Sequence, residues 1–109
     1  MFTQSLRIFW STSAFIGNEI LSIQVQKTPN PNALKFILPK AQFTQPLSFS
    51  SAAAAATHPL ARQLFALGNI YNVFMVQDFV TVNKLPDVSW AVLETAIQAV
   101  LEQYFSDKW

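Results

Sequence analysis

The chain has 109 residues, enough for one hydrophobic core and too few for two. Its formal net charge is +1 and 12% of its residues are charged, so no basic stripe for nucleic acid or an anionic membrane is present. Cysteine is absent, which excludes disulfides, thiolate nucleophiles and cysteine-ligated metal centres within this chain.

Residues 1–19 are rich in hydroxyl side chains, include Arg7 and contain no acidic residue before Glu19. That composition is typical of an organellar transit peptide. Because one arginine is few, a disordered extension or an upstream start codon is the simpler interpretation, and the leader stays open as the alternative. No apolar run reaches the roughly 18 to 20 residues of a membrane-spanning helix.

The strongest local signal is the loop Thr28-Pro29-Asn30-Pro31-Asn32. Proline lacks an N–H and restricts the residue before it, and asparagine favours turns. Apolar and polar residues alternate on both sides of the loop, with the apolar positions at Leu21, Ile23, Val25, Leu34 and Phe36. This alternation predicts a hairpin over residues 21–38. The loop itself is either a stiff turn or a preorganised docking surface.

Residues 41–57 are mostly small and polar, and they include an alanine run at 52–56. Alanines favour helix locally but supply little apolar area for burial. We expect a mobile loop that leads into a helix, with or without a short edge strand at 47–49.

A helix is predicted to begin at Pro59, where the missing N–H of proline costs nothing. His58 or Thr57 caps it, and Gly68 ends it in the left-handed conformation. The apolar face of this helix carries Leu60, Leu64, Phe65 and Leu67. His58 is expected to be a cap or a solvent contact and not a metal ligand.

Two further β-rich runs, at 70–76 and 79–83, are separated by Gln77-Asp78, a length that suits a hairpin. Val80 and Val82 are expected on one face of the second strand, with Phe79 on the other.

A last helix is predicted from Trp90, after a stop and cap at residues 86–89. Its apolar stripe consists of Trp90, Leu93, Ile97, Val100, Leu101 and Tyr104. About sixteen residues give roughly 24 Å of helix, enough to cross a four-stranded sheet. The stripe is therefore best explained as core.

The predicted order is strand, strand, helix, strand, strand, helix. It indicates an α+β fold, a two-layer sandwich in which both helices cover one face of a mainly antiparallel four-stranded sheet. This domain is expected over residues 20–109, after the extension or leader at 1–19. A single histidine, two glycines and scattered acidic residues offer no activated nucleophile, phosphate loop or metal site, so the chain is not expected to be an enzyme.

The string from Thr28 to Phe36 resembles the TPNPNxLKF signature of the N-terminal domain of Nfu-type, or NifU-like, iron–sulfur scaffold proteins. The similarity continues in the same order at residues 59–65, 72–74 and 78–82, and at Trp90 after Asp87. It spans about residues 21–105. The resemblance implies the same two-layer α+β fold.

Full-length members of that family carry a second domain whose CxxC pair binds the cluster at a subunit interface. This chain has no cysteine, so the resemblance implies an adaptor that contacts iron–sulfur scaffold or client proteins without ligating a cluster itself. An iron–sulfur cluster is then reached only through a partner. The alternative is a general protein-interaction module of the same fold with no iron–sulfur role.

The resemblance also implies roles for the matching positions. Three are expected to be exposed and to bind the partner: Asn30, Asn32 and Lys35. The others are expected to be structural: Pro29, Pro31, Phe36, Pro59, Leu64, Asp78 and Phe79. Neither nucleic acid nor membrane is expected as a partner, and the oligomeric state stays open. The location is expected to be cytoplasmic in a bacterium and mitochondrial or plastid in a eukaryote, with the cytoplasm preferred.

Overall fold

The alternating residues on either side of the proline-rich loop form two antiparallel strands, β4 (Gln24–Lys27) and β5 (Ala33–Ile37). The computed structural model describes residues 14–16 and 19–106. Three more strands complete the sheet: β6 (Phe43–Phe49), β7 (Ile70–Gln77) and β8 (Phe79–Lys84). All neighbours pair antiparallel in the order β4-β5-β8-β7-β6. The predicted hairpin is confirmed over residues 24–37, whereas Leu21, expected in its first strand, lies in a separate strand that does not pair with β5.

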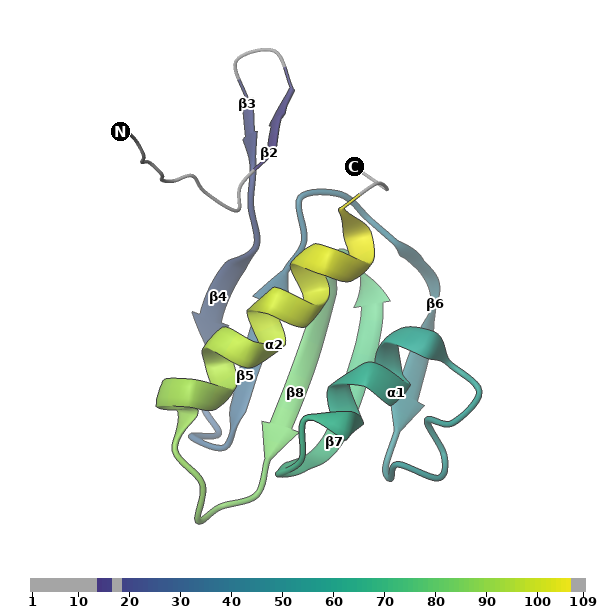
Figure 1. Ribbon diagram of the computed structural model, residues 1–109, viewed down its shortest axis with the longest axis vertical. Helices are drawn as coiled ribbons and strands as arrows, with labels where there is room; N and C mark the ends of the chain where they lie inside the picture. Colours follow the sequence, from purple (N-terminus) through teal and green to yellow (C-terminus); the bar gives the residue numbers. More distant parts are fainter. Residues whose placement is uncertain (1–13, 17–18, 107–109) are drawn as a thin grey trace, which may run out of the picture.

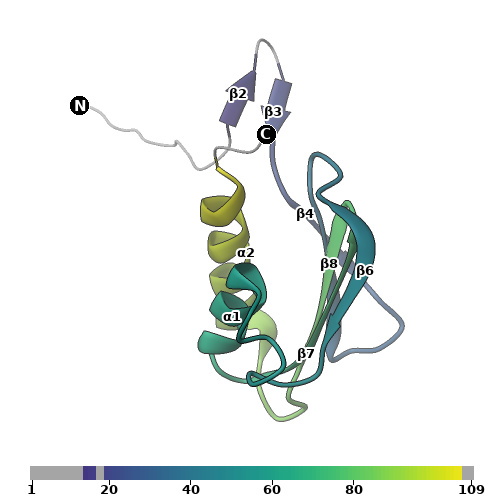
Figure 2. The same cartoon turned by 90° about the vertical axis from the view of Figure 1, so that its right-hand side faces the viewer.

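Two helices, α1 (Pro59–Ala66) and α2 (Trp90–Phe105), lie side by side on one face of this sheet (Figure 1). Seen edge-on, the molecule has two layers, and no helix of residues 14–16 and 19–106 covers the other face of the sheet (Figure 2). The predicted α+β class and the placement of both helices on one face are therefore confirmed.

The prediction of four strands is wrong, because β6 adds a fifth in the stretch expected to be mainly loop. Phe43, Leu47 and Phe49 pack partly buried against the core, but the pairing of β6 with β7 shifts register between Phe43 and Leu47. The strand also contains Pro46, which is tolerated because β6 is an edge strand. The irregularity interrupts the alternation of apolar and polar residues by which a strand is recognised in a sequence.

A small two-stranded sheet precedes the domain, formed by β2 (Ala14–Ile16) and β3 (Glu19–Leu21). The predicted extension at residues 1–19 falls for the most part outside the described residues. No helix in the described part of the chain has both the length and the apolar character needed to cross a bilayer.

The core lies between the helices and the sheet. Its largest fully buried side chains are Phe36, Leu60, Leu64, Val73, Met75, Val80, Val82, Ile97 and Leu101. Val80 and Val82 are fully buried while Phe79 and Thr81 are half-buried, as the alternation predicts. Truncating a buried phenylalanine such as Phe36 to alanine costs about 3 to 5 kcal/mol.

Helix α1 begins at Pro59, and the Nδ1 atom of His58 accepts a hydrogen bond from the Ala61 N–H at 3.3 Å. His58 is therefore the cap, as predicted. Gly68, just past the helix, has φ of +81°. A Cβ atom there would meet nothing within 4 Å, so the requirement for glycine comes from the backbone.

Helix α2 begins at Trp90, with Ser89 as its cap through a 3.1 Å bond from the Ala91 N–H to the serine hydroxyl. Its buried side chains are Leu93, Ile97, Leu101 and Phe105. The predicted start and stripe are confirmed, and the cap fixes Trp90 at the end of the sheet where β8 finishes.

We predict that His58→Asn reduces the pH dependence of stability. Burial lowers the pKa of His58 below its ordinary value of 6.5. The folded state then binds fewer protons than the unfolded state, so this group's stabilisation is present above pH 6.5 and is lost as pH falls through the lowered pKa. Asparagine also caps helices but does not titrate. Urea unfolding between about pH 5 and pH 8 measures the difference. Parallel pH profiles of the two proteins would contradict this role of His58.

Candidate functional site

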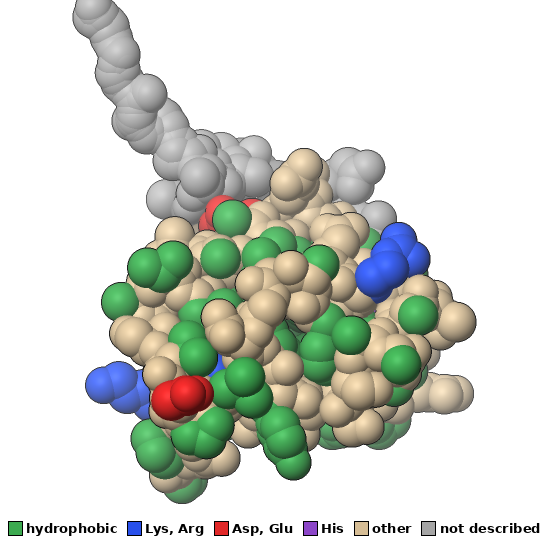
Figure 3. Space-filling view, turned by 60° about the horizontal axis from the view of Figure 1, so that its bottom comes forward, with side chains coloured by type: hydrophobic (Ala, Val, Ile, Leu, Met, Phe, Trp, Pro, Cys, Tyr) green, Lys and Arg blue, Asp and Glu red, His purple; other side chains and the backbone are tan. Residues whose placement is uncertain are grey.

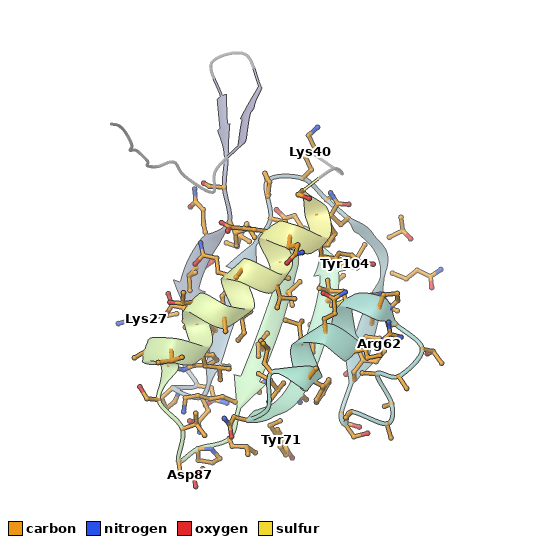
Figure 4. The ribbon with its side chains drawn as sticks, viewed as in Figure 1. Lys27, Lys40, Arg62, Tyr71, Asp87 and Tyr104 are labelled. Atoms are coloured by element: carbon orange, nitrogen blue, oxygen red, sulfur yellow. The ribbon has the colours of Figure 1, made fainter. Side chains whose placement is uncertain are left out.

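Three segments that are distant in sequence meet at one end of the sheet: residues 28–32 between β4 and β5, residues 69–71 at the start of β7, and residues 83–90 between β8 and α2. We call this the loop end. It is the lower end of the molecule in Figure 1, and Tyr71 and Asp87 mark it in Figure 4. The Leu85 N–H donates to the Asn69 carbonyl at 3.0 Å and joins two of the segments.

The loop from Thr28 to Asn32 is held by its own hydrogen bonds. The Asn30 N–H donates to the Thr28 hydroxyl at 3.1 Å, and the Asn32 N–H donates to the Asn30 side-chain oxygen at 2.9 Å. A turn bond from the Ala33 N–H to the Asn30 carbonyl, at 3.0 Å, closes it. With two prolines also restricting φ, the loop keeps one conformation at little entropic cost on binding.

The same loop is anchored to the rest of the domain through Lys84 and Trp90. The Lys84 N–H donates to the Asn32 carbonyl at 2.8 Å, and its ammonium donates to the Asn32 side-chain oxygen at 3.0 Å. The indole N–H of Trp90 donates to the Pro31 carbonyl at 2.9 Å. Each such bond adds about 1 kcal/mol net, so the loop moves with β8 and α2.

Among the described residues, Lys84 is the polar residue that is buried, with 7% of its surface exposed. Its ammonium also lies 3.3 Å from the Leu85 carbonyl and 5.6 Å from the centre of the Trp90 ring. All of these partners are uncharged. The loop end therefore contains a buried positive charge held by neutral groups.

Two hollows flank the loop. A groove of about 340 Å³ runs along it and is lined by Lys27, Thr28, Pro29, Asn30, Pro31, Ala33, Leu34 and Trp90. A smaller cavity of about 210 Å³ lies between Asn30, Asn32, Tyr71, Asn83, Lys84 and Pro86. Asn30 borders both hollows.

Apolar side chains are exposed around these hollows. Tyr71 is 63% exposed and Leu85 37% exposed. Figure 3, in which the loop end comes forward, shows hydrophobic side chains gathered on this surface. A rigid loop beside an exposed aromatic residue and an apolar groove is suited to bind a protein partner.

The three residues expected to bind a partner do not form one group. Asn30 is exposed at the tip of the loop, whereas Asn32 is half-buried because its side chain holds Lys84. Lys35 is half-buried on the sheet face opposite the helices, with its ammonium 4.1 Å from the centre of the Phe79 ring. The structure thus brings Asn30 and Asn32 together and places Lys35 elsewhere.

The residues expected to be structural occupy several places. Pro29 and Pro31 line the groove, Phe36 and Leu64 are fully buried, and Pro59 starts α1. The carbonyl of Asp78, in the turn between β7 and β8, accepts a 2.6 Å bond from the Leu38 N–H, while Phe79 lies under Lys35.

Sequence reasoning assigned no role to Lys84 or Tyr71, and treated Trp90 as part of a helical stripe. One signal for Lys84 was available. It follows Val80 and Val82 at a spacing of two, which places its side chain on the buried face of β8. No local pattern indicates that Trp90 bonds to Pro31.

Within the described residues, no group of three or more histidine, cysteine or acidic side chains is placed to hold a metal ion.

A family model described as scaffold protein Nfu/NifU N terminal matches residues 23–108. The chain is 43% identical over 86 residues to the human NFU1 iron-sulfur cluster scaffold homolog, mitochondrial, covering 77% of this chain and 34% of that protein. It is 39% identical over 85 residues to the mitochondrial NifU-like protein 5 of Arabidopsis thaliana, covering 77% and 31%. The chain therefore spans about a third of the length of these relatives.

Solved structures share the fold. A NifU-like protein from Saccharomyces cerevisiae superposes with a TM-score of 0.72 at 21% identity, over 94% of this chain and 87% of that one. Protein SAV1430 from Staphylococcus aureus superposes with a TM-score of 0.64 at 20% identity, over 74% of this chain and 99% of that one.

We predict that Trp90→Phe loosens the loop without unfolding the domain. Phenylalanine keeps an aromatic ring but lacks the N–H that bonds the Pro31 carbonyl, a loss of about 1 kcal/mol. Hydrogen exchange should become faster at the Asn32 and Ala33 amides and stay unchanged at Val73 in the core of β7. Unchanged exchange throughout would show that the indole bond does not hold the loop.

Proposed function

Because the chain belongs to the Nfu/NifU N-terminal family of iron–sulfur scaffold proteins, we propose that it is a docking domain in iron–sulfur cluster assembly or transfer. It acts through protein–protein contacts at the loop end and does not ligate the cluster itself. Family membership supports the iron–sulfur role, and the geometry of the loop end supports docking as the mechanism.

The observation that carries the proposal is the anchored loop. Bonds from Lys84 and Trp90 fix a loop that is already closed by its own turn bonds, next to a groove of about 340 Å³. A surface that is rigid before binding loses little conformational entropy when a partner docks. The exposed Tyr71 ring provides the kind of aromatic contact that dominates binding energy at many interfaces.

The lack of cysteine side chains determines what the chain can bind by itself. The 109 residues contain no cysteine, so thiolates for a cluster have to come from another domain or another protein. We therefore assign the chain no cofactor of its own and no enzymatic step. The partners proposed are cluster-carrying scaffold proteins or the client proteins that receive clusters.

Location follows from the relatives. The human and Arabidopsis proteins are named as mitochondrial. We propose a mitochondrial location for the chain in a eukaryotic cell, and the preference for a bacterial cytoplasm finds no support among these relatives.

We predict that the purified chain stays colourless under anaerobic reconstitution with iron and sulfide. Without thiolates it has no soft ligands for a cluster. Absorbance between about 300 and 500 nm, together with iron and sulfide analysis after desalting, provides the measurement. A stable cluster in this chain alone would refute the claim that it does not ligate one.

We also predict that Tyr71→Ser weakens partner binding about tenfold or more while thermal stability changes little, since the ring is largely exposed. The tagged chain is used for affinity capture from its own cells, and the recovered partner is then purified and titrated. Gln103→Ala is the matched control, because Gln103 is exposed in the last turn of α2, at the end of that helix away from Trp90.

Recovery of iron–sulfur scaffold or client proteins that bind Gln103→Ala normally and Tyr71→Ser weakly supports the proposal. Recovery of partners unrelated to iron–sulfur proteins would favour the general interaction module instead. Equal binding by both variants would show that the docking surface does not include Tyr71 at the loop end.

A further inference from the structure

The smaller cavity at the loop end has an unusual electrostatic character. Of its lining residues, Asn30, Asn32, Tyr71, Asn83, Lys84 and Pro86, Lys84 alone is charged. Lys84 as a whole is 7% exposed, and the partners that the described residues provide for its ammonium are neutral. A buried charge that lacks an opposite charge is costly, and a bound anion would remove that cost.

The Lys84 ammonium has more N–H groups than the acceptors that bond it. The Lys84 ammonium has three N–H groups and two oxygen acceptors within the described residues, the Asn32 side chain and the Leu85 carbonyl. One N–H is left to donate. The surrounding groups thus leave capacity for an additional acceptor.

The asparagine amides are oriented so that they add to this excess. Lysine can only donate, so the oxygen of the Asn32 amide must face Lys84 and its NH2 group must face away. The Asn30 oxygen is likewise occupied by the Asn32 N–H. Both NH2 groups remain as donors near the cavity. The Asn83 amide donates to the Asn72 side chain at 2.6 Å and keeps a second N–H.

From this arrangement we propose that the cavity binds a carboxylate, supplied by an aspartate or glutamate side chain of the docking partner. A single lysine balances one carboxylate charge, and amide donors complete the hydrogen bonds of its oxygens. A phosphate, with a charge of about −2 near neutral pH, would call for a second cation, and the cavity lining offers none. The inference rests on the proposed docking function and adds the chemistry that the partner must present.

The surroundings define the partner segment further. Tyr71 lines the cavity, and Asn30 lines both the cavity and the groove that Pro29, Pro31 and Trp90 help to form. An acidic residue in the cavity would therefore place neighbouring apolar residues against the tyrosine ring and the groove. Asp87, exposed in the connection between β8 and α2, does not line the cavity (Figure 4).

The test is a titration of the 15N-labelled chain with sodium acetate, followed by NMR at constant ionic strength. Acetamide, a neutral molecule of the same shape, is the matched probe, and inorganic phosphate is a third arm. We expect saturable shifts at the side-chain amides of Asn32 and Asn83 with acetate, with Kd on the order of 10 mM. Acetamide should cause at least tenfold weaker effects. Equal responses to acetate and acetamide, or a stronger response to phosphate, would overturn the inference.

Two variants test whether Lys84 supplies the positive charge that binds acetate. Lys84→Met keeps an unbranched side chain, one atom shorter and uncharged, and should lose the acetate response. Lys40→Met, which removes an exposed lysine between β5 and β6, should keep it. An undiminished response in a folded Lys84→Met protein would overturn the assignment. The comparison of acetate with acetamide uses the unaltered chain, so it decides the question even where Lys84→Met does not fold.

The outcome is separable from that of the proposed function. A captured iron–sulfur partner that binds through Tyr71, combined with no selective acetate response, would overturn the carboxylate site and leave docking in place. A selective acetate response combined with an unrelated captured partner would uphold the site and overturn the iron–sulfur assignment.

Discussion

The pair of hydrogen bonds between Asn32 and Lys84 is the interaction on which the loop end depends. One bond joins main chain to main chain at 2.8 Å, and the other joins the ammonium to the amide oxygen at 3.0 Å. The first extends the pairing of β5 with β8 beyond Ala33 and Asn83. The second keeps a lysine inside the domain and turns the asparagine NH2 group outward. This residue pair therefore helps to fix the loop, holds the buried lysine and orients the Asn32 amide at the cavity.

Much of the fold could be predicted because its signals are local. Pro59, Gly68 and Ser89 act through the backbone within a few residues, and the alternation in β5 and β8 appears directly in the sequence. Of the fifth strand, only the optional edge strand at 47–49 was anticipated, because a register shift and Pro46 interrupt the alternation of β6. Its three apolar side chains contribute to the core only once β7 lies beside them.

The candidate site was predictable only in part, since it depends on contacts between distant residues. The proline-rich loop was identified correctly as the rigid element, but Lys84 lies 52 positions after Asn32 and Trp90 lies 59 positions after Pro31. The signature that carries the family resemblance combines several tasks. Asn30 closes the turn, Asn32 holds the buried lysine, and Phe36 fills the core. These residues of the signature therefore determine mainly the conformation of the loop and its packing on the core.

The long separation between the loop and its anchors has a consequence for biosynthesis. The loop leaves the ribosome first, and both residues that fix it are synthesised more than fifty positions later. Contacts of such high sequence separation form late, because a long segment of chain must be closed before they are gained. A nascent chain that ends before Lys84 lacks both anchors, and one that ends between Lys84 and Trp90 has only the first. The loop end, which we propose as the docking surface, is thus fully anchored only once Trp90 and the start of α2 are in place.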